Sequence, residues 1–380
     1  MKPKILISIN TAWNLVNFRS GLIQVLVSQG YEVVAVAPHD VYAYRLASLG
    51  CRFIALPMDN QGTHPVRDLM LLFGFLKLLH RERPDVFLGY TVKSNIYGSL
   101  AARMLGIPVV NNIAGLGAVF IQDGWLVRLV RGLYRVALSR SAKVFFQNND
   151  DRALFVNTGL VRPEVADLLP GSGIDLTRFS NNSDDTALQH STGNDGHFRF
   201  LLIARMLRDK GVGEYVTAAK LIRLRYPHAE CCLLGFVDVQ NPAAISRAEM
   251  DAWVAQGNVI YLGVSDDVRG EIAAADCIVL PSYREGTPRT LLEAAAMGKP
   301  IVTTDAVGCR DVVDDGVNGY LCKVRDAKDL AEKMLRMIEL SSSARIAMGV
   351  AGRKKMECEF DEKIVIDKYL EAIGAIVSKR

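Results

Sequence analysis

One stretch of the chain combines a buried strand, a polar loop and a helix start in an order that suits an anion. The apolar run Ile278–Pro281 predicts the strand, and Glu285-Gly286-Thr287-Pro288 forms the loop. The proline fits the first turn of a helix at about Arg289–Met297, because its missing N–H costs nothing there. The backbone N–H groups of Thr290 and Leu291 would then be free, and the helix dipole would favour a phosphate.

Two glutamates lie near this helix start. Glu285 is on the loop beside Gly286, which permits a close approach of the backbone to a ligand. Glu293 lies one turn into the helix. Because a carboxylate beside a phosphate is electrostatically unfavourable, Glu293 is best explained by hydrogen bonds to neutral hydroxyls such as a ribose diol. Taken alone, it could equally be an exposed residue of the helix surface.

A pair of cations follows another predicted strand, Phe200–Ala204. Arg205 and Lys210 lie on the loop between this strand and the next helix. An arginine offers a planar fork of donors and a lysine a point charge, so the pair suits a diphosphate. Surface cations are common, and the weight of this pair comes from its position in the chain. Together, the two loops predict binding sites for a diphosphate and for a ribose.

These loops need elements that position them, and the chain supplies an alternation of short apolar runs and helical stretches. This order predicts parallel sheets covered by helices on both faces. The predicted strands are residues 5–9, 32–37, 53–56, 86–88, 109–113, 144–147, 200–204, 231–235, 259–262, 278–281 and 301–304.

A polar stretch, Asn181–Gly196, interrupts the alternation and is expected to be a surface linker or loop. We therefore predict an α/β protein with two doubly wound, Rossmann-like domains, residues 1–175 and 176–360. Their two sheets are expected to face an interdomain cleft. The last predicted helix, at about 361–380, can pack back on the first domain.

The composition excludes several classes of protein. Half of the 380 residues are apolar and 23% are charged, which is typical of a globular chain with two cores. The seven cysteines form no CxxC pair and no cluster with metal-ligand spacing, which predicts buried thiols in a reducing compartment. The longest membrane-like run, Leu69–Leu79, is far shorter than the about 20 residues of a spanning helix. The first run, Ile5–Ile9, is too short for a secretory signal. We expect a cytoplasmic protein with no metal and no cofactor.

The C-terminal motifs resemble the donor site of the retaining glycosyltransferase family 4. The resemblance rests on Arg205…Lys210-Gly211 and on Glu285-Gly286-Thr287-Pro288…Leu291-Leu292-Glu293, which contains the family's Glu-x7-Glu pattern. It implies the GT-B fold, a nucleotide-sugar donor and metal-independent transfer. It also implies that Arg205 and Lys210 neutralise the donor diphosphate, that Glu293 holds the ribose and that Glu285 contacts the donor sugar. Arg205, Lys210 and Glu285 are the implied catalytic residues. The implied donor site is completed by Gly286, Thr287, Thr290 and Leu291.

The N-terminal half resembles a narrower branch of that family, which acts on lipid-linked sugars in bacterial surface-polysaccharide assembly. The likeness rests on segments that follow predicted strands: Asn17–Gly21, Tyr90–Asn95, Asn112–Gly117 and Phe146–Asp151. It implies a lipid-linked sugar acceptor, with Asn17, Arg19, Lys93 and Asn95 on the acceptor side. Many members carry a His after the fifth strand, where this chain has Ala114. Lys93 is a candidate for the polar contact that such a His would make.

The charge of the chain is unevenly distributed. The formal net charge is +4, with an excess of basic residues in 1–180 and of acidic residues in 181–380. The stretch Leu126–Lys143 has no acid, and Arg128, Arg131 and Arg135 share one face of the predicted helix. The opposite face is expected to carry an apolar stripe that includes Leu126, Leu129 and Leu133. This helix could rest on an anionic membrane, or it could be an ordinary core-facing helix with a basic exterior.

The residues and the resemblance together predict a retaining enzyme with a UDP-N-acetylhexosamine donor, such as UDP-GalNAc or UDP-GlcNAc, and a polyprenyl-diphosphate sugar acceptor. We expect it at the inner face of the cytoplasmic membrane, bound peripherally. A hexose donor such as UDP-Gal or UDP-Glc is the alternative. A dehydrogenase would need G-x-G-x-x-G after its first strand, and Asn10–Gly21 has no such motif. A non-catalytic lipid- or RNA-binding module would leave Glu285 and Glu293 unexplained, and no nucleic acid is expected as a partner.

Overall fold

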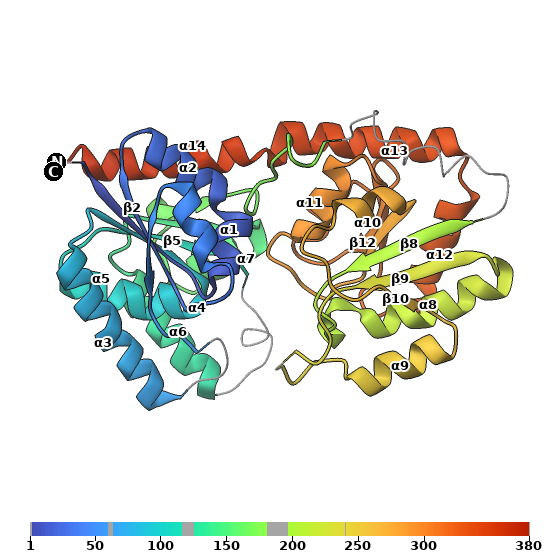
Figure 1. Ribbon diagram of the computed structural model, residues 1–380, viewed down its shortest axis with the longest axis horizontal. Coiled ribbons are helices and arrows are strands. Elements are labelled where there is room, and N and C mark those ends of the chain that lie inside the picture. The colour runs from blue at the N-terminus through green and yellow to red at the C-terminus, as the bar shows by residue number, and fades with distance from the viewer. Residues whose placement is uncertain (1, 60–63, 116–124, 181–196, 240, 380) are drawn as a thin grey trace. The chain divides into compact units, whose positions relative to one another are not determined.

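The computed structural model describes residues 2–59, 64–115, 125–180, 197–239 and 241–379. The chain forms two compact units (Figure 1). The first comprises Met1–Gly173 and Glu362–Arg380, and the second comprises Ile174–Asp361. Each unit contains one parallel sheet with helices on both faces, as the sequence predicts. The predicted linker Asn181–Gly196 lies outside the described residues.

The first sheet has seven parallel strands in the order β3-β2-β1-β4-β5-β6-β7. Their bounds are β1 Lys4–Ser8, β2 Glu32–Ala37, β3 Arg52–Ala55, β4 Val86–Tyr90, β5 Val109–Ile113, β6 Lys143–Phe146 and β7 Ala166–Leu168. The central strands are buried on both sides, so they appear in the sequence as continuous apolar runs. The sequence pattern missed β7, a strand of three residues at the sheet edge.

The helices of the first unit form two layers around this sheet (Figure 1). One core joins the sheet to α1 (Ala12–Phe18), α2 (Ser20–Ser28) and α14 (Glu362–Val377). Another core, on the other face, joins it to α3 (Pro65–Glu82) and α5 (Ser99–Met104). A third core lies under α6 (Trp125–Leu138) and α7 (Asn149–Asn157). The remaining helical segments are a 3₁₀ turn Ala43–Leu49, α4 Thr91–Lys93, a π-helical turn Ser94–Gly98 and a 3₁₀ turn Pro163–Val165.

The second sheet has six parallel strands in the order β10-β9-β8-β11-β12-β13. The strands are β8 Phe198–Ile203, β9 Ala229–Leu234, β10 Ile260–Tyr261, β11 Cys277–Leu280, β12 Ile301–Thr304 and β13 Gly319–Cys322. The sequence pattern missed β13, a second edge strand. The helical segments are a 3₁₀ turn Arg208–Lys210, α8 Val212–Arg225, α9 Arg247–Ala255, α10 Arg269–Ala274, α11 Arg289–Ala296, α12 Ala327–Glu339, α13 Ser342–Lys355 and a π-helical turn Met356–Phe360.

The final helix, α14, belongs to the first unit although the whole second unit precedes it in the chain. It buries Val365, Ile366, Tyr369 and Ile373 beside α2, where Figure 1 draws the last helix next to one of the first. The Tyr369 hydroxyl accepts a hydrogen bond of 2.9 Å from the Asn112 side chain of β5. The first sheet is therefore covered only when the end of the chain is in place.

Candidate functional site

The predicted donor residues gather at one point of the second sheet. In its strand order, β8 and β11 are neighbours at the centre, and the chain winds outward from them in opposite directions. Ligands of doubly wound sheets bind at the carboxyl ends of the strands at such a switch point. Arg205 and Lys210 follow β8, and Glu285 and Glu293 follow β11. The topology thus brings the two predicted loops to the same edge.

Lys210 and Glu285 form an ion pair. The Lys210 Nζ lies 2.5 Å from the Glu285 carboxylate, and each side chain is 16% exposed. Lys210 ends a 3₁₀ turn, and Gly211 follows it with a φ of +71°. A Cβ at Gly211 would lie 2.1 Å from the carbonyl oxygen of Pro281, so only glycine lets the two loops meet there.

A third loop supports Glu285 from the other side. The Glu285 N–H donates to the Val307 carbonyl at 3.0 Å. Gly308 has a φ of +82°, and a Cβ on it would lie 2.4 Å from the carbonyl oxygen of Gly286. Gly286 is buried and Thr287 is partly buried. The loop that carries Glu285 is therefore held on two sides by glycines of neighbouring segments.

The helix start differs from the expected one in one detail. Pro288 is the N-cap of α11, and no side chain caps this end. The Thr290 hydroxyl donates to the Ile203 carbonyl at 3.1 Å, which fastens α11 to the end of β8. The Leu291 N–H, expected to be free, donates to the Pro288 carbonyl at 3.0 Å because the first turn closes in a tighter, 3₁₀-like manner. Its side chain is fully buried in the core.

Glu293 is not an exposed residue of the helix surface. Its side chain is 13% exposed, and its carboxylate accepts a hydrogen bond of 3.1 Å from the Arg289 guanidinium one turn earlier. Burial raises the pKa of Glu293, and the nearby charges of Arg289 and Arg178 only partly oppose this effect. A carboxylate held this way has acceptor capacity for a ligand hydroxyl. Arg205, by contrast, is exposed and forms no ion pair with any described residue.

The predicted acceptor residues lie at the corresponding edge of the first sheet. Its switch point is between β1 and β4. Asn17 and Arg19 follow β1, and Lys93 and Asn95 follow β4. Arg19 is buried, with its guanidinium carbon 4.4 Å from the centre of the Tyr90 ring and one N–H bonded to the Phe18 carbonyl at 3.0 Å.

Unsatisfied polar atoms concentrate beside Arg19. Within the part of the chain that the structure describes, three buried side-chain N or O atoms have no hydrogen-bond partner: the Nε of Arg19, the hydroxyl of Tyr90 and the Oγ1 of Thr91. Thr91 also has a φ of +63°, which is strained for a β-branched residue. Unsatisfied groups and strain are features of ligand sites. Both Tyr90 and Thr91 lie in the segment Tyr90–Asn95 that carries the N-terminal resemblance, but no role was predicted for either residue.

Two other acceptor-side residues are engaged within the first unit. The Lys93 ammonium pairs with the buried Asp68 of α3 at 2.8 Å. The Asn95 side chain donates to the Asn112 carbonyl at 2.8 Å and accepts from Asn111 at 2.9 Å, and it is 1% exposed. Asn95 therefore fixes the turn after β4 to β5 and does not face solvent.

Asn17 is partly exposed, and its amide donates to the Trp13 carbonyl at 3.0 Å. Ala114 is exposed at the end of β5. The part of the predicted segment beyond Gly115 lies outside the described residues. On the acceptor side, Arg19 and Asn17 are the predicted residues whose surroundings leave them suited to a ligand.

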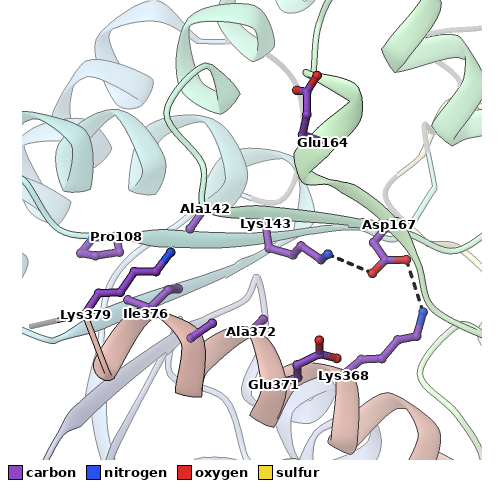
Figure 2. Close-up of a pocket in the computed structure, with 11 residues that line it drawn as sticks. Pro108, Ala142, Lys143, Glu164, Asp167, Lys368, Glu371, Ala372, Ile376 and Lys379 are labelled. Atoms are coloured by element: carbon purple, nitrogen blue, oxygen red, sulfur yellow. Dashed lines mark hydrogen bonds and ion pairs between the residues drawn. The ribbon is translucent and has the colours of Figure 1, made fainter.

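A hollow in the first unit contains none of the predicted site residues. Figure 2 shows this cavity of about 450 Å³, where α14 faces the strands β6 and β7. Asp167 forms ion pairs with Lys143 at 3.0 Å and with Lys368 at 3.3 Å across it. Burial alone would raise the pKa of Asp167, but the Leu168 N–H and Lys143 hold it below its usual value. These contacts tie α14 to the sheet at the edge opposite the acceptor residues.

Among the residues that the structure describes, no group of three His, Cys, Asp or Glu side chains is arranged to hold a metal ion. None of the described helices is both long and apolar enough to span a membrane.

Known proteins resemble both halves of the chain. Residues 18–171 match the glycosyl transferase 4-like domain, and residues 197–340 match the glycosyl transferases group 1 domain. The chain is 29% identical over 374 residues, 96% of each protein, to the N,N'-diacetylbacillosaminyl-diphospho-undecaprenol alpha-1,3-N-acetylgalactosaminyltransferase of Campylobacter jejuni. It is 30% identical over 318 residues to the N-acetyl-alpha-D-glucosaminyl L-malate synthase of Bacillus anthracis, covering 80% of this chain and 78% of that protein.

The fold agrees with this relationship. The crystal structure of Anabaena HepE in complex with UDP and glucose superposes with a TM-score of 0.77 at 18% identity, over 98% of this chain and all of that one. The resemblance stated from the motifs at residues 205–211 and 285–293 is thus confirmed across both halves of the chain. The chain belongs to the group 1, family 4 glycosyltransferases and has the two Rossmann-like domains of the GT-B fold.

Proposed function

We propose that this glycosyltransferase moves an N-acetylhexosamine, GalNAc or GlcNAc, from a UDP-sugar to a polyprenyl-diphosphate-linked sugar, with retention and without a metal ion. The observation that carries the donor side is the edge between β8 and β11. The Lys210–Glu285 pair lies in the loops at this edge, and the mostly buried Glu293 lies in the helix α11 that follows, whose start has no side-chain cap. The name of the Campylobacter jejuni relative, which specifies N-acetylgalactosamine and a diphospho-undecaprenol acceptor, supports the choice of both substrates.

Each donor residue then has a distinct task. Arg205 and Lys210 bind the diphosphate, whose charge increases as it leaves, so their attraction is strongest in the transition state. The carboxylate of Glu293 accepts hydrogen bonds from the ribose hydroxyls. Glu285 contacts the donor sugar, and its ion pair with Lys210 balances the two charges before the donor binds. The start of α11 adds the favourable end of a helix dipole.

The reaction needs no nucleophile from the protein. The acceptor hydroxyl oxygen bonds to the anomeric carbon while the bond from that carbon to the β-phosphate oxygen breaks on the same face. The proton of the hydroxyl passes to the departing phosphate, so charge and atoms balance between donor and acceptor. Cationic side chains take the place that a divalent ion has in metal-dependent transferases.

A transfer assay tests the proposal. The enzyme is given UDP-GalNAc, UDP-GlcNAc, UDP-Gal or UDP-Glc with a synthetic polyprenyl-diphosphate sugar, and the linkage formed is identified by NMR. We expect transfer of an N-acetylhexosamine with an α-linkage. Preferential transfer of Gal or Glc would instead establish the hexose alternative, and a β-linked product would contradict retention.

Chelation tests the metal-independent part. Because Lys210, Arg205 and the helix start supply the positive charge at the diphosphate, turnover in excess EDTA should stay within about twofold of turnover with Mg²⁺. Loss of transfer in EDTA, restored by Mg²⁺, would show that these groups do not replace a metal ion.

The proposed acceptor places the enzyme at the inner face of the cytoplasmic membrane, and α6 suits such a surface. Arg128 and Arg135 are exposed on it. The predicted apolar stripe is not the buried face of α6: Leu129 is half exposed, and the helix buries Val127, Val130 and Tyr134. The buried side of α6 packs against α7, where the ring centres of Tyr134 and Phe155 are 5.5 Å apart. The side chain of Leu126 lies outside the described residues.

Charge reversal on α6 tests this placement. Replacing Arg128, Arg131 and Arg135 together by Glu should remove the salt-dependent part of binding to anionic vesicles, since each basic residue near such a surface contributes about 1 kcal/mol. High salt should weaken binding of the parent in the same way. Co-sedimentation with vesicles measures the effect, and the triple Lys variant, which keeps the charge, is the control. Unchanged binding of the Glu variant would exclude α6 from the membrane contact.

A further inference from the structure

Helix α3 carries an apolar surface that no described residue of its own unit covers. Val66, Leu69, Met70 and Phe73 are 58%, 53%, 68% and 61% exposed. Their spacing places them on one face of the helix over its first two turns. We call these four residues the α3 stripe. Scattered exposed apolar residues are ordinary, but four neighbours in one row mark an interaction surface.

The opposite side of α3 is packed against the first sheet, so the exposure of the stripe does not result from a poorly packed helix. On its inner side, α3 buries Leu71, Phe75, Leu78 and Leu79 against the first sheet. The rings of Phe75 and Phe87 meet edge to face at 5.9 Å. The helix therefore has one apolar face for the core and a second for another partner.

Both acids of α3 are turned inward. Asp68 pairs with Lys93 at 2.8 Å, and Glu82 pairs with Arg52 and Lys4. The Arg52 contact holds the pKa of Glu82 at about 2, although burial opposes it. The exposed surface of α3 consequently carries no carboxylate.

Basic side chains continue the face of the stripe toward the end of the helix. Lys77, His80 and Arg81 follow Phe73 at helical spacing, and all three are exposed. Arg81 contacts Glu82 at 3.0 Å, and Arg67, near the start, pairs with Asp59 at 2.9 Å. The face thus changes along its length from apolar to basic, which is the pattern of a helix that enters a membrane interface at one end.

We propose that the α3 stripe inserts into the interface of an anionic bilayer, with the basic end of α3 at the level of the lipid headgroups. A second copy of the chain fits less well, because a stable dimer buries roughly 800 Å² on each partner and the stripe offers one row of four side chains. The absence of exposed carboxylates on α3 complements anionic lipid and would not help pair two identical basic surfaces.

The position of the stripe links it to the acceptor, and this step rests on the proposed function. Asp68 lies between Val66 and Leu69 and binds Lys93, at the edge of the sheet where the acceptor residues gather. A lipid-linked sugar could keep its polyprenyl chain in the bilayer beside the stripe while its diphosphate sugar reaches that edge. Insertion of α3 would set the depth of the acceptor site relative to the membrane.

Vesicle binding tests the insertion directly. The variant Leu69→Gln/Met70→Gln/Phe73→Gln is compared with the parent on phosphatidylcholine vesicles with and without phosphatidylglycerol, at low and high salt. We expect the part of binding that survives high salt to fall at least about tenfold, because apolar burial is not screened by ions. The control is Ile346→Gln/Val350→Gln on α13 of the second unit, where the two side chains are 66% and 64% exposed. Equal loss in the control would overturn the proposal.

Two further measurements separate the possible outcomes. In Phe73→Trp, lipids brominated on their acyl chains should quench the new indole, whereas in Ile346→Trp they should not. Sedimentation velocity without lipid should show no change of association state in the triple variant. Failure of quenching would contradict insertion, and a dimeric parent that becomes monomeric in the triple variant would identify the stripe as a protein interface.

The proposed function is tested apart from these results. With a water-soluble, short-chain acceptor, the triple variant should keep the turnover and UDP affinity of the parent, and it should lose turnover only with acceptor in vesicles. If the parent transfers no sugar at all, the proposed function fails while the vesicle and quenching data still decide the role of the α3 stripe.

Discussion

Replacement of Glu293 by alanine should weaken UDP and UDP-sugar binding alike, by roughly 1.5–3 kcal/mol, or about tenfold to a hundredfold in Kd. The carboxylate is buried near the start of α11 and keeps acceptor capacity beyond its contact with Arg289. Removing it deletes a charged hydrogen bond to the ribose. Calorimetry with UDP measures the change.

A ribose analogue makes this test specific. UDP that lacks the 2′ and 3′ hydroxyls should bind the parent poorly and should bind the parent and Glu293→Ala equally. Arg289→Ala serves as the control, since it removes the other partner of the carboxylate without removing the acceptor. If the alanine variant binds UDP as the parent does, Glu293 is not the ribose contact.

The raised pKa of Glu293 adds a dependence on pH. Burial disfavours the charged form, and the ribose needs that form, so UDP affinity should be complete above the raised pKa and decline as the pH falls through it. The decline should start at a higher pH than an ordinary glutamate would give. In Glu293→Gln this part of the profile should be flat, and an unchanged profile would mean that another group titrates.

Replacement of Glu285 by alanine should lower turnover and leave UDP binding unchanged, in contrast to the Glu293 variant. UDP affinity should survive, because the change frees Lys210 from its pair and leaves the diphosphate seat intact. Turnover should fall by roughly a hundredfold or more, since the lost contact to the donor sugar is strongest in the transition state. Lys210→Ala and Arg205→Ala should lower turnover too, with weaker UDP binding in the lysine variant.

The control for Glu285→Ala is another ion-paired glutamate of the same unit. Glu230 pairs with Arg199 at 2.7 Å, near the start of β9 and therefore at the opposite edge of the sheet. Glu230→Ala should leave turnover unchanged. Comparable loss in both variants would indicate damage to the fold and not to the donor site.

The elements that the sequence predicted well are those with a strong local pattern. The central strand β11 is a continuous apolar run, and the spacing between Glu285 in the loop and Glu293 in α11 can be recognised in the sequence alone. The edge strands β7 and β13 were missed because neither contains a β-branched residue: β7 reads Ala-Asp-Leu, and β13 reads Gly-Tyr-Leu-Cys.

Residue roles that depend on distant partners could not be predicted in this way. Lys93 finds Asp68, which lies 25 positions away, and Asn112 finds Tyr369, which lies 257 positions away. The sequence suggests a polar loop residue at Asn95, but its buried side chain forms hydrogen bonds with Asn111 and Asn112 of β5. The buried face of α6 was predicted incorrectly because this helix has apolar residues on several sides. Which of these faces is buried depends on the elements that pack against the helix.

The chain order of the two units also sets the order in which they can be completed during synthesis. The second unit, Ile174–Asp361, is continuous, and its whole sequence is synthesised before that of α14. The first unit begins earlier but must wait, with the apolar surface beneath Val365, Ile366 and Tyr369 uncovered, until its last helix arrives. The unit whose translation begins first is therefore completed last, and its apolar surface stays uncovered until the final helix has been made.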